Sequence, residues 1–183
     1  ELADAARLLP ELSAFGVDAL IVQDMGLAAL ARRLCPQMRL HASTQLAVHN
    51  REGARTLARL GFSRVVLARE LTLDEIRETS GEAIETEVFV HGALCYSYSG
   101  VCVFSSLAHG RSGNRGTCAQ PCRKMCRVAT ALPPFDHATR DPSSGLPFSL
   151  KDLALGGRVC DVAAGGAASL KIEGRKKSAL YVA

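Results

Sequence analysis

The sequence lacks a long hydrophobic run: no stretch approaches the roughly 20 apolar residues that cross a bilayer. No signal peptide precedes Glu1, so we expect a cytoplasmic protein without a membrane span. Disulfides are rare in that compartment, and seven cysteines are an odd number that cannot all pair. Clustered thiols in a reducing compartment more often serve metal or redox chemistry, which is what we expect here.

Carboxylates are absent from one long part of the chain, between Glu87 and Asp136. The basic residues inside this gap are Arg111, Arg115, Arg123, Lys124 and Arg127. The net charge of +4 is too small to indicate nucleic-acid binding by itself. The local excess of positive charge nevertheless favours an anionic substrate or RNA phosphates. A solvated basic loop is the competing interpretation.

Two hydrolytic motifs are also missing. The chain contains neither the HExxH helix of zinc peptidases nor the nucleophile elbow of serine hydrolases. Hydrolysis needs a nucleophile–base pair or a metal-bound water, so the residues give little support to a peptidase. An initiator Met is absent as well, and the chain stops at "SALYVA" within a helical pattern. We therefore interpret the sequence as a fragment.

What the sequence does contain is a regular alternation of strand-like and helical patterns. Asn50 and Thr72 are typical caps ahead of two of the helical patterns, and a glycine closes each of them. Such alternation predicts an α/β fold with a parallel sheet and right-handed crossovers. The expected strands, parallel and adjacent in this order, are 18–24, 39–44, 63–69, 85–92, 147–152 and 168–174.

These strands suit either an open doubly wound sheet or part of a (β/α)8 TIM-type barrel. Polar residues recur where the strands end, which is the face on which barrel enzymes place their chemistry. The recurrence favours the barrel, as a partial domain over 1–183 whose two missing strands would precede residue 1. Single residues such as Ser43 or Asp152 can simply cap helices. The strand-end residues predicted to contact substrate are His41, His91, Lys171, Glu173 and Arg175.

A cysteine-rich insertion follows at about 92–127. Cys95 and Cys102 flank a loop, and Cys118 and Cys122 bracket "AQP", where the proline prevents a helix. A structural zinc prefers pairs separated by about two to four residues, which only the second pair satisfies. An iron–sulfur cluster takes thiolates from separated loops, and we place it slightly ahead of zinc. A catalytic cysteine with His91 as its base is the weaker third alternative.

The cysteine motif leads to a family resemblance. "EVFVHGALCYSYSGVCVFSS" followed by "GRSGNRGTCAQPCR" closely resembles the signature of the collagenase-like peptidase family, U32. Segments that resemble the same family in the same order are "IVQDMG", "HASTQLAVHN", "VVLARELTLDEI" and "SLKIEGRKKSALYVA". The resemblance covers essentially the whole chain, and the long cysteine motif is highly specific.

The resemblance implies more than the family name states. Several members were catalogued as peptidases, yet the better understood ones resemble oxygen-independent hydroxylases that modify a tRNA uridine, an rRNA cytidine or a ubiquinone precursor. They carry a 4Fe-4S iron–sulfur cluster on four cysteines, and some depend on prephenate as the oxygen donor. Members of the ubiquinone branch act in pairs, which makes a paired homologue a candidate partner.

The same resemblance implies a set of cluster ligands. Cys95, Cys102 and Cys118 match the motif. Many relatives place the fourth cysteine directly after Lys-Asp-Leu, where this chain has Ala154. Cys122 is the nearest replacement and is the predicted fourth ligand, and Cys160, six residues past the usual position, is the alternative.

The leading hypothesis is an iron–sulfur hydroxylase that acts on tRNA or rRNA. In it, Arg111, Arg115 and Arg123 surround the cysteines and bind the anionic donor or the RNA backbone through bidentate contacts. Arg115 can alternatively pin the glycine-rich loop by bonding its carbonyls. The competing hypotheses are a collagenase-like peptidase and a non-catalytic RNA-binding partner with a structural cluster.

Overall fold

The computed structural model describes residues 1–81, 83–125, 145–174 and 177–182 of the chain. The strands are β1 (Ala19–Val22), β2 (Arg39–Ala42), β3 (Arg64–Val66), β4 (Glu85–Gly92), β5 (Leu153–Ala154) and β6 (Ser169–Glu173). The helices are α1 (Leu2–Ala14), α2 (Met25–Leu34), α3 (Arg51–Arg59), α4 (Leu73–Thr79), α5 (Phe104–His109), α6 (Val159–Ala164) and α7 (Ala179–Val182). None of the helices in the described ranges has both the length and the apolar character needed to cross a membrane.

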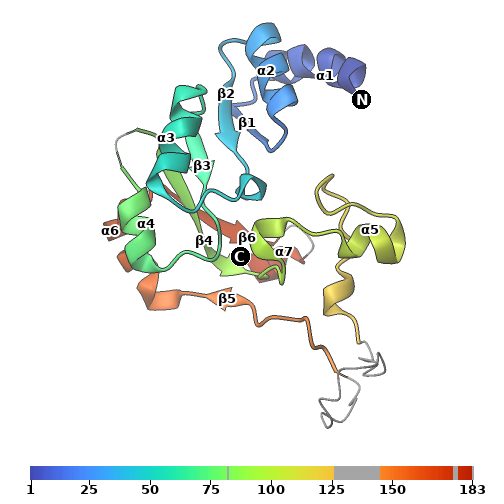
Figure 1. Cartoon of the computed structure of the whole chain (residues 1–183), viewed down its shortest axis with the longest axis vertical. Coiled ribbons are helices and arrows are strands. Elements are labelled where there is room, and N and C mark those ends of the chain that lie inside the picture. Colours follow the sequence, from blue (N-terminus) through green and yellow to red (C-terminus); the bar gives the residue numbers. More distant parts are fainter. Residues whose placement is uncertain (82, 126–144, 175–176, 183) are drawn as a thin grey trace, which may run out of the picture.

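The first four strands form a parallel sheet in sequence order. β1 pairs with β2, β2 with β3, and β3 with β4. β6 is also parallel and pairs along the later part of β4, from Glu87 to Gly92. The first four predicted strands are therefore confirmed in order and direction, and the chain has a mixed α/β architecture (Figure 1).

The fifth predicted strand is wrong. Residues 147–152 form a turn and an irregular stretch, and β5 follows them as a short strand antiparallel to β4. β6, expected beside 147–152, pairs directly with β4 instead. The reason lies in β4: β3 pairs with it only as far as Glu87, which leaves one edge of its last residues open to a second partner. The N–H and C=O groups on that edge are satisfied by β5.

Local sequence explains where α3 and α4 begin. The Asn50 side chain accepts a hydrogen bond from the Gly53 N–H (2.8 Å) at the start of α3. At the start of α4, the Thr72 hydroxyl accepts from the Glu75 N–H, and the Glu75 carboxylate accepts from the Thr72 N–H. Both caps satisfy N–H groups that a helix leaves free in its first turn, as predicted for these two residues.

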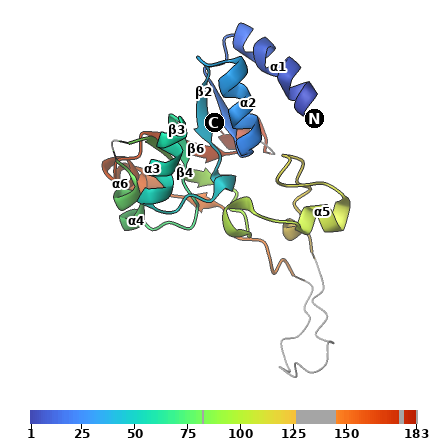
Figure 2. The same cartoon turned by 45° about the horizontal axis from the view of Figure 1, so that its top comes forward.

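The hydrophobic core lies between the sheet and the helices on one of its faces. Alternate strand residues enter this core, among them Leu40 and Ala42 of β2 and Val88 and Val90 of β4. Helix residues in the same core are Ala28, Ala31, Ala54, Leu57, Ile76 and Val162. Helices α3, α4 and α6 lie on one side of the sheet, whereas α5 lies on the other, in both Figure 1 and Figure 2. The remaining strand residues therefore face away from α3, α4 and α6.

Candidate functional site

The cysteine-rich segment is held at the carboxyl ends of the first parallel strands. Gln23, directly after β1, donates its side-chain N–H to the carbonyl of Asn114. Gln45, just after β2, donates to the carbonyl of Gly113 (3.3 Å). The polar residues predicted at the strand ends thus include two that dock this segment on the sheet.

A third anchor follows β3. The Glu70 carboxylate accepts hydrogen bonds from the N–H of Ser99 (2.6 Å) and from its hydroxyl (2.5 Å). Ser99 is fully buried and has a left-handed backbone with φ of 41°, an unfavourable conformation for a residue with a side chain. Burial raises the pKa of Glu70, but the two hydrogen bonds from Ser99, together with the Glu70 N–H and the charge of Arg69, hold this pKa below its usual value. An ionised carboxylate therefore stabilises the turn between Cys95 and Cys102.

The predicted ligand cysteines all lie on this segment. Cys95, Cys102, Cys118 and Cys122 are unpaired and half-buried. The sulfur of Cys102 accepts the N–H of Phe104, and that of Cys118 accepts the N–H of Gln120, both at 3.3 Å. The alternative ligand Cys160 is exposed on α6, which lies across the sheet from α5 (Figure 1).

Three of these thiols form one electrostatic neighbourhood. Burial raises the pKa of Cys122, and the nearby thiols of Cys95 and Cys118 raise it further, whereas Arg123 lowers it. Mutual repulsion between thiolates is the condition that a bound cation relieves. Within the described ranges, however, no group of three or more His, Cys, Asp or Glu side chains is arranged to hold a metal ion. The donor chemistry fits a thiolate-ligated centre, and three of the four thiols share a neighbourhood without being gathered around one point.

Arg123 connects this neighbourhood to the chain beyond it. Its guanidinium donates to the carbonyl of Leu94 (3.0 Å) and lies 3.4 Å from the Asp152 carboxylate. Asp152 also accepts a hydrogen bond from the Tyr181 hydroxyl (2.6 Å) and lies 3.5 Å from the Lys177 ammonium. The absence of carboxylates from the sequence around the arginines does not carry over to the fold, because Asp152 is distant in sequence but adjacent to Arg123.

The other two predicted arginines are placed differently. Arg115 forms an exposed ion pair with Glu1 (2.8 Å) instead of bonding loop carbonyls. Arg111 is exposed, and its side chain has no hydrogen bond or ion pair within the described residues. Of the three arginines, Arg111 alone combines exposure with a side chain that is not already engaged by another described residue.

The predicted strand residues lie mostly on the face of the sheet opposite the helix-covered core. Lys171 of β6 binds Glu87 of β4 at 2.6 Å. His41 is buried within β2 beside Arg64 instead of at a strand end, and its pKa is lowered, first by burial and then by Arg64. His91 lies beside Tyr181, with the rings tilted by 49° and 5.6 Å between their centroids. Glu173 pairs with Gly92 in the β4–β6 register, and Arg175 lies outside the described residues.

Sequence reasoning missed Glu87 and Arg64 as members of this face. Arg64 reaches Glu87 at 3.3 Å and Glu85 at 2.7 Å, so Glu87 is held between cations from two neighbouring strands. The signal was present in the period-2 placement of charges in "ETEVFV", which puts Glu85 and Glu87 on one face of a strand. One further cation, Arg69, lies 4.8 Å from the ring centre of Phe89, and Lys171 itself lies 5.8 Å from the same ring centre.

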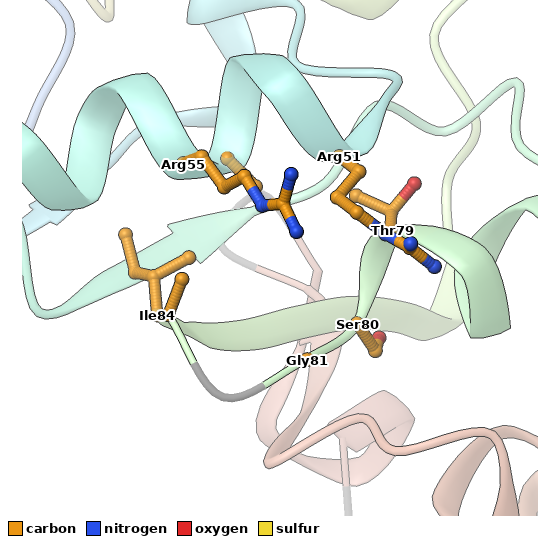
Figure 3. A pocket seen from close by; sticks show the side chains of 8 residues that line it. Arg51, Arg55, Thr79, Ser80, Gly81 and Ile84 are labelled. Carbon is orange, nitrogen blue, oxygen red and sulfur yellow. The ribbon is translucent and has the colours of Figure 1, made fainter.

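A surface hollow of about 480 Å³ lies elsewhere, between α3 and the connection from α4 to β4 (Figure 3). Arg51 and Arg55 project into it from α3 (Figure 3). Both are engaged: Arg51 donates to the carbonyl of Glu78 (2.7 Å), and Arg55 pairs with Glu52 (2.8 Å). No cysteine lines the hollow, so we place the candidate site at the cysteine-rich segment instead.

The parallel α/β sheet carries the cysteine-rich segment at its strand ends, and comparison with known families agrees with the resemblance of that segment. The profile of "Peptidase family U32" matches residues 1–183. The chain therefore belongs to this family.

Relatives within the family carry different names. The chain is 43% identical over 183 residues to the "23S rRNA 5-hydroxycytidine C2501 synthase" of Escherichia coli (strain K12), covering 100% of this chain and 27% of that protein. It is 36% identical over 182 residues to the "tRNA hydroxylation protein P" of Helicobacter pylori, covering 91% and 41%. It is 33% identical over 189 residues to the "Collagenase" of Porphyromonas gingivalis, covering 91% and 42%. The chain thus spans less than half the length of these relatives, and no solved structure matches it.

Proposed function

We propose that this chain is part of an oxygen-independent hydroxylase that modifies a nucleobase of tRNA or rRNA in the cytoplasm. The observation that carries the proposal is the 43% identity, over the whole chain, to a protein named as an rRNA hydroxycytidine synthase. The tRNA hydroxylation protein, similar over 91% of the chain, supports the same class of substrate. Exposed Arg111 and the local absence of carboxylates from the insertion suit RNA phosphates or an anionic donor such as prephenate.

The proposed cofactor is a 4Fe-4S cluster. Cys95, Cys118 and Cys122 would hold it as an electrostatically linked group, and Cys102 would supply the fourth thiolate. When bound, such a cluster supplies one-electron chemistry or a site that positions the oxygen donor. The N–H groups directed at the sulfurs of Cys102 and Cys118 would tune the potential of the group that these sulfurs hold.

The proposed scaffold is a (β/α)8 TIM-type barrel to which this chain contributes consecutive strands over 1–183, with an insertion at about 92–127. Parallel order along β1 to β4, continued by β6, supports it. The charged face formed by Arg64, Glu87 and Lys171 supports it too, because in a closed barrel that face is shielded from water. The antiparallel β5 (Leu153–Ala154), which follows the insertion in sequence, would then not be one of the barrel strands.

Peptidase activity is the second candidate, and the collagenase relative favours it. Among the described residues, the cysteine nearest a histidine in sequence is Cys95, four positions after His91. His91 contacts Tyr181 instead of a thiol, so no nucleophile–base pair supports hydrolysis there. The third candidate, a non-catalytic RNA-binding partner, draws only on Ala154 at the family's cysteine position.

The test uses the full-length protein purified without oxygen. We expect the purified protein to contain iron and sulfide in equal amounts. In a strain that lacks the gene, we expect the wild-type gene to restore the hydroxylated nucleoside, which mass spectrometry of the RNA detects. Cys118→Ser should lose both iron and modification. Cys35→Ala, which alters a buried core thiol on the helix-covered side, should lose neither.

Two outcomes would overturn the proposal. One is iron-free protein that still restores the hydroxylated nucleoside, which would exclude an iron–sulfur cluster as the cofactor. The other is RNA from the complemented strain without any hydroxylated nucleoside, combined with protein hydrolysis by the purified enzyme, which would favour the peptidase. Loss of iron in Cys160→Ser but not in Cys122→Ser would show that Cys160, and not Cys122, is the fourth ligand.

A further inference from the structure

Arg123 occupies an unusual position relative to the cysteines. It directly follows Cys122, and one of its N–H groups donates to the carbonyl of Leu94, which directly precedes Cys95 (3.0 Å). A single guanidinium therefore links the backbones next to two cysteines that are 27 positions apart in the chain (122 minus 95). No other arginine of the insertion makes such a link within the described residues.

The other side of the same guanidinium is held by Asp152, with 3.4 Å between the charged atoms. Asp152 is itself oriented by the Tyr181 hydroxyl at 2.6 Å and by the Lys177 ammonium at 3.5 Å. The side chains of Arg123 and Asp152 are only 23% and 29% exposed, so this pair is less screened than a surface ion pair. The carboxylate thus fixes the orientation of the guanidinium that spans the two loops.

We infer that Arg123 and Asp152 are positioning residues, which hold the loops of Cys95 and Cys122 at the separation that the metal centre requires, and that Arg123 does not bind substrate. The inference rests on the proposed function to the extent that these thiols hold the cluster. A guanidinium presents several N–H donors in a rigid plane, so it can bond a carbonyl and a carboxylate at the same time. A lysine ammonium keeps the charge but lacks that fork.

The geometry leaves Arg123 little capacity for a substrate anion. Its two terminal nitrogens are directed at Leu94 and Asp152, and an anionic donor would have to compete with the Asp152 carboxylate. Arrangements of this kind next to metal ligands typically change metal affinity about 10- to 100-fold when they are removed. The same range is expected here.

The experiment compares Arg123→Lys and Asp152→Asn with a matched pair, Arg158→Lys and Asp161→Asn. Arg158 and Asp161 also form an ion pair at 3.4 Å, but at the start of α6, across the sheet from the insertion. In full-length protein we expect Arg123→Lys to release iron to a chelator about tenfold faster or more, and Asp152→Asn to act in the same direction. Both matched variants should behave as wild type, and KM for RNA and donor should stay unchanged in Arg123→Lys.

A second readout does not depend on the cluster. In metal-free protein, a short bifunctional thiol reagent should cross-link Cys95 to Cys122, and the yield should fall in Arg123→Lys and Asp152→Asn. If wild type binds no iron, the proposed cofactor fails, whereas the cross-link still tests the tether. Unchanged iron release and cross-linking in both variants, or a raised KM for the donor at unchanged iron content, would overturn the inference. If Arg123→Lys fails to fold, as judged by circular dichroism, Asp152→Asn decides the same question.

Discussion

At the scale of single residues, Glu87 is the one Asp, Glu, Lys or Arg that is buried among the described residues. Its side chain is 8% exposed and lies between Lys171 at 2.6 Å and Arg64 at 3.3 Å. Burial raises the pKa of Glu87, but the hydrogen bond and charge of Lys171, together with Ser169 and Arg64, hold it below its usual value. The carboxylate is therefore ionised at neutral pH, and it joins β3, β4 and β6 through two cations.

Replacing Glu87 by Gln should destabilise the protein by about 3 kcal/mol, because two partly buried cations would lose their shared counter-charge. Glu85→Gln is the control: it removes a carboxylate that also binds Arg64 but is 52% exposed, and it should cost less than about 1 kcal/mol. Urea unfolding of both full-length variants measures the difference. Equal losses would show that burial of Glu87 adds nothing to its ion pairs.

At the scale of elements, the end of β4 decides how the insertion begins. Gly92 is the last residue of β4 and has φ of +111°. A Cβ at this position would lie 2.0 Å from the backbone carbonyl oxygen of Glu173 in β6. Gly92 therefore allows β4 and β6 to stay paired up to the point where the chain turns into the cysteine-rich segment.

Gly92→Ala should destabilise the β4–β6 pairing by at least about 3 kcal/mol, since strain and a backbone clash act together. Gly16→Ala is the matched control, because Gly16 also has a positive φ (+75°) but nothing within 4 Å of an added Cβ, and strain alone costs about 1 to 2 kcal/mol. Hydrogen exchange of β4 and β6 amides in the full-length protein reports the change. A loss in Gly92→Ala no larger than in Gly16→Ala would contradict the steric argument.

At the scale of the whole molecule, the insertion and the sheet form one unit through three anchors. Gln23, Gln45 and Glu70 each follow a strand and each bond the insertion. Glu70 is the one anchor of the three that titrates, and its pKa lies below the usual 4.5 because Ser99 donates to its charged form. A carboxylate with a lowered pKa stabilises the docked state fully above its usual pKa.

Docking of the insertion should therefore weaken as pH falls from about 4.5 through the lowered pKa of Glu70. Hydrogen exchange followed by mass spectrometry, corrected for the intrinsic pH dependence, should show loss of protection around Ser99 over this range. Glu70→Gln should lose that protection already at neutral pH. Glu75→Gln, which removes the capping carboxylate of α4, should change protection in α4 and leave the insertion unaffected. Identical pH profiles for wild type and Glu70→Gln would refute the role of Glu70.

Much of the fold follows from the sequence because its causes are local. Asn50 and Thr72 cap helices with donors only three residues away, and apolar alternation along a strand depends on its own residues. The strand–helix spacing therefore predicted β1 to β4 in order. The short β5 could not be found this way, because its two residues are ordered by the open edge of β4 and not by their own pattern.

The sequence by itself determined the family, the parallel sheet and the segment that carries the cysteines. Only the tertiary structure decided what the charged residues do. It pairs Arg123 with Asp152, Arg115 with Glu1 and Lys171 with Glu87, partners that lie 29, 114 and 84 positions apart. The physical reason is range: a hydrogen bond or ion pair acts over a few ångströms, so its partner is chosen by the folded chain, whereas caps and alternation are set by neighbours in sequence.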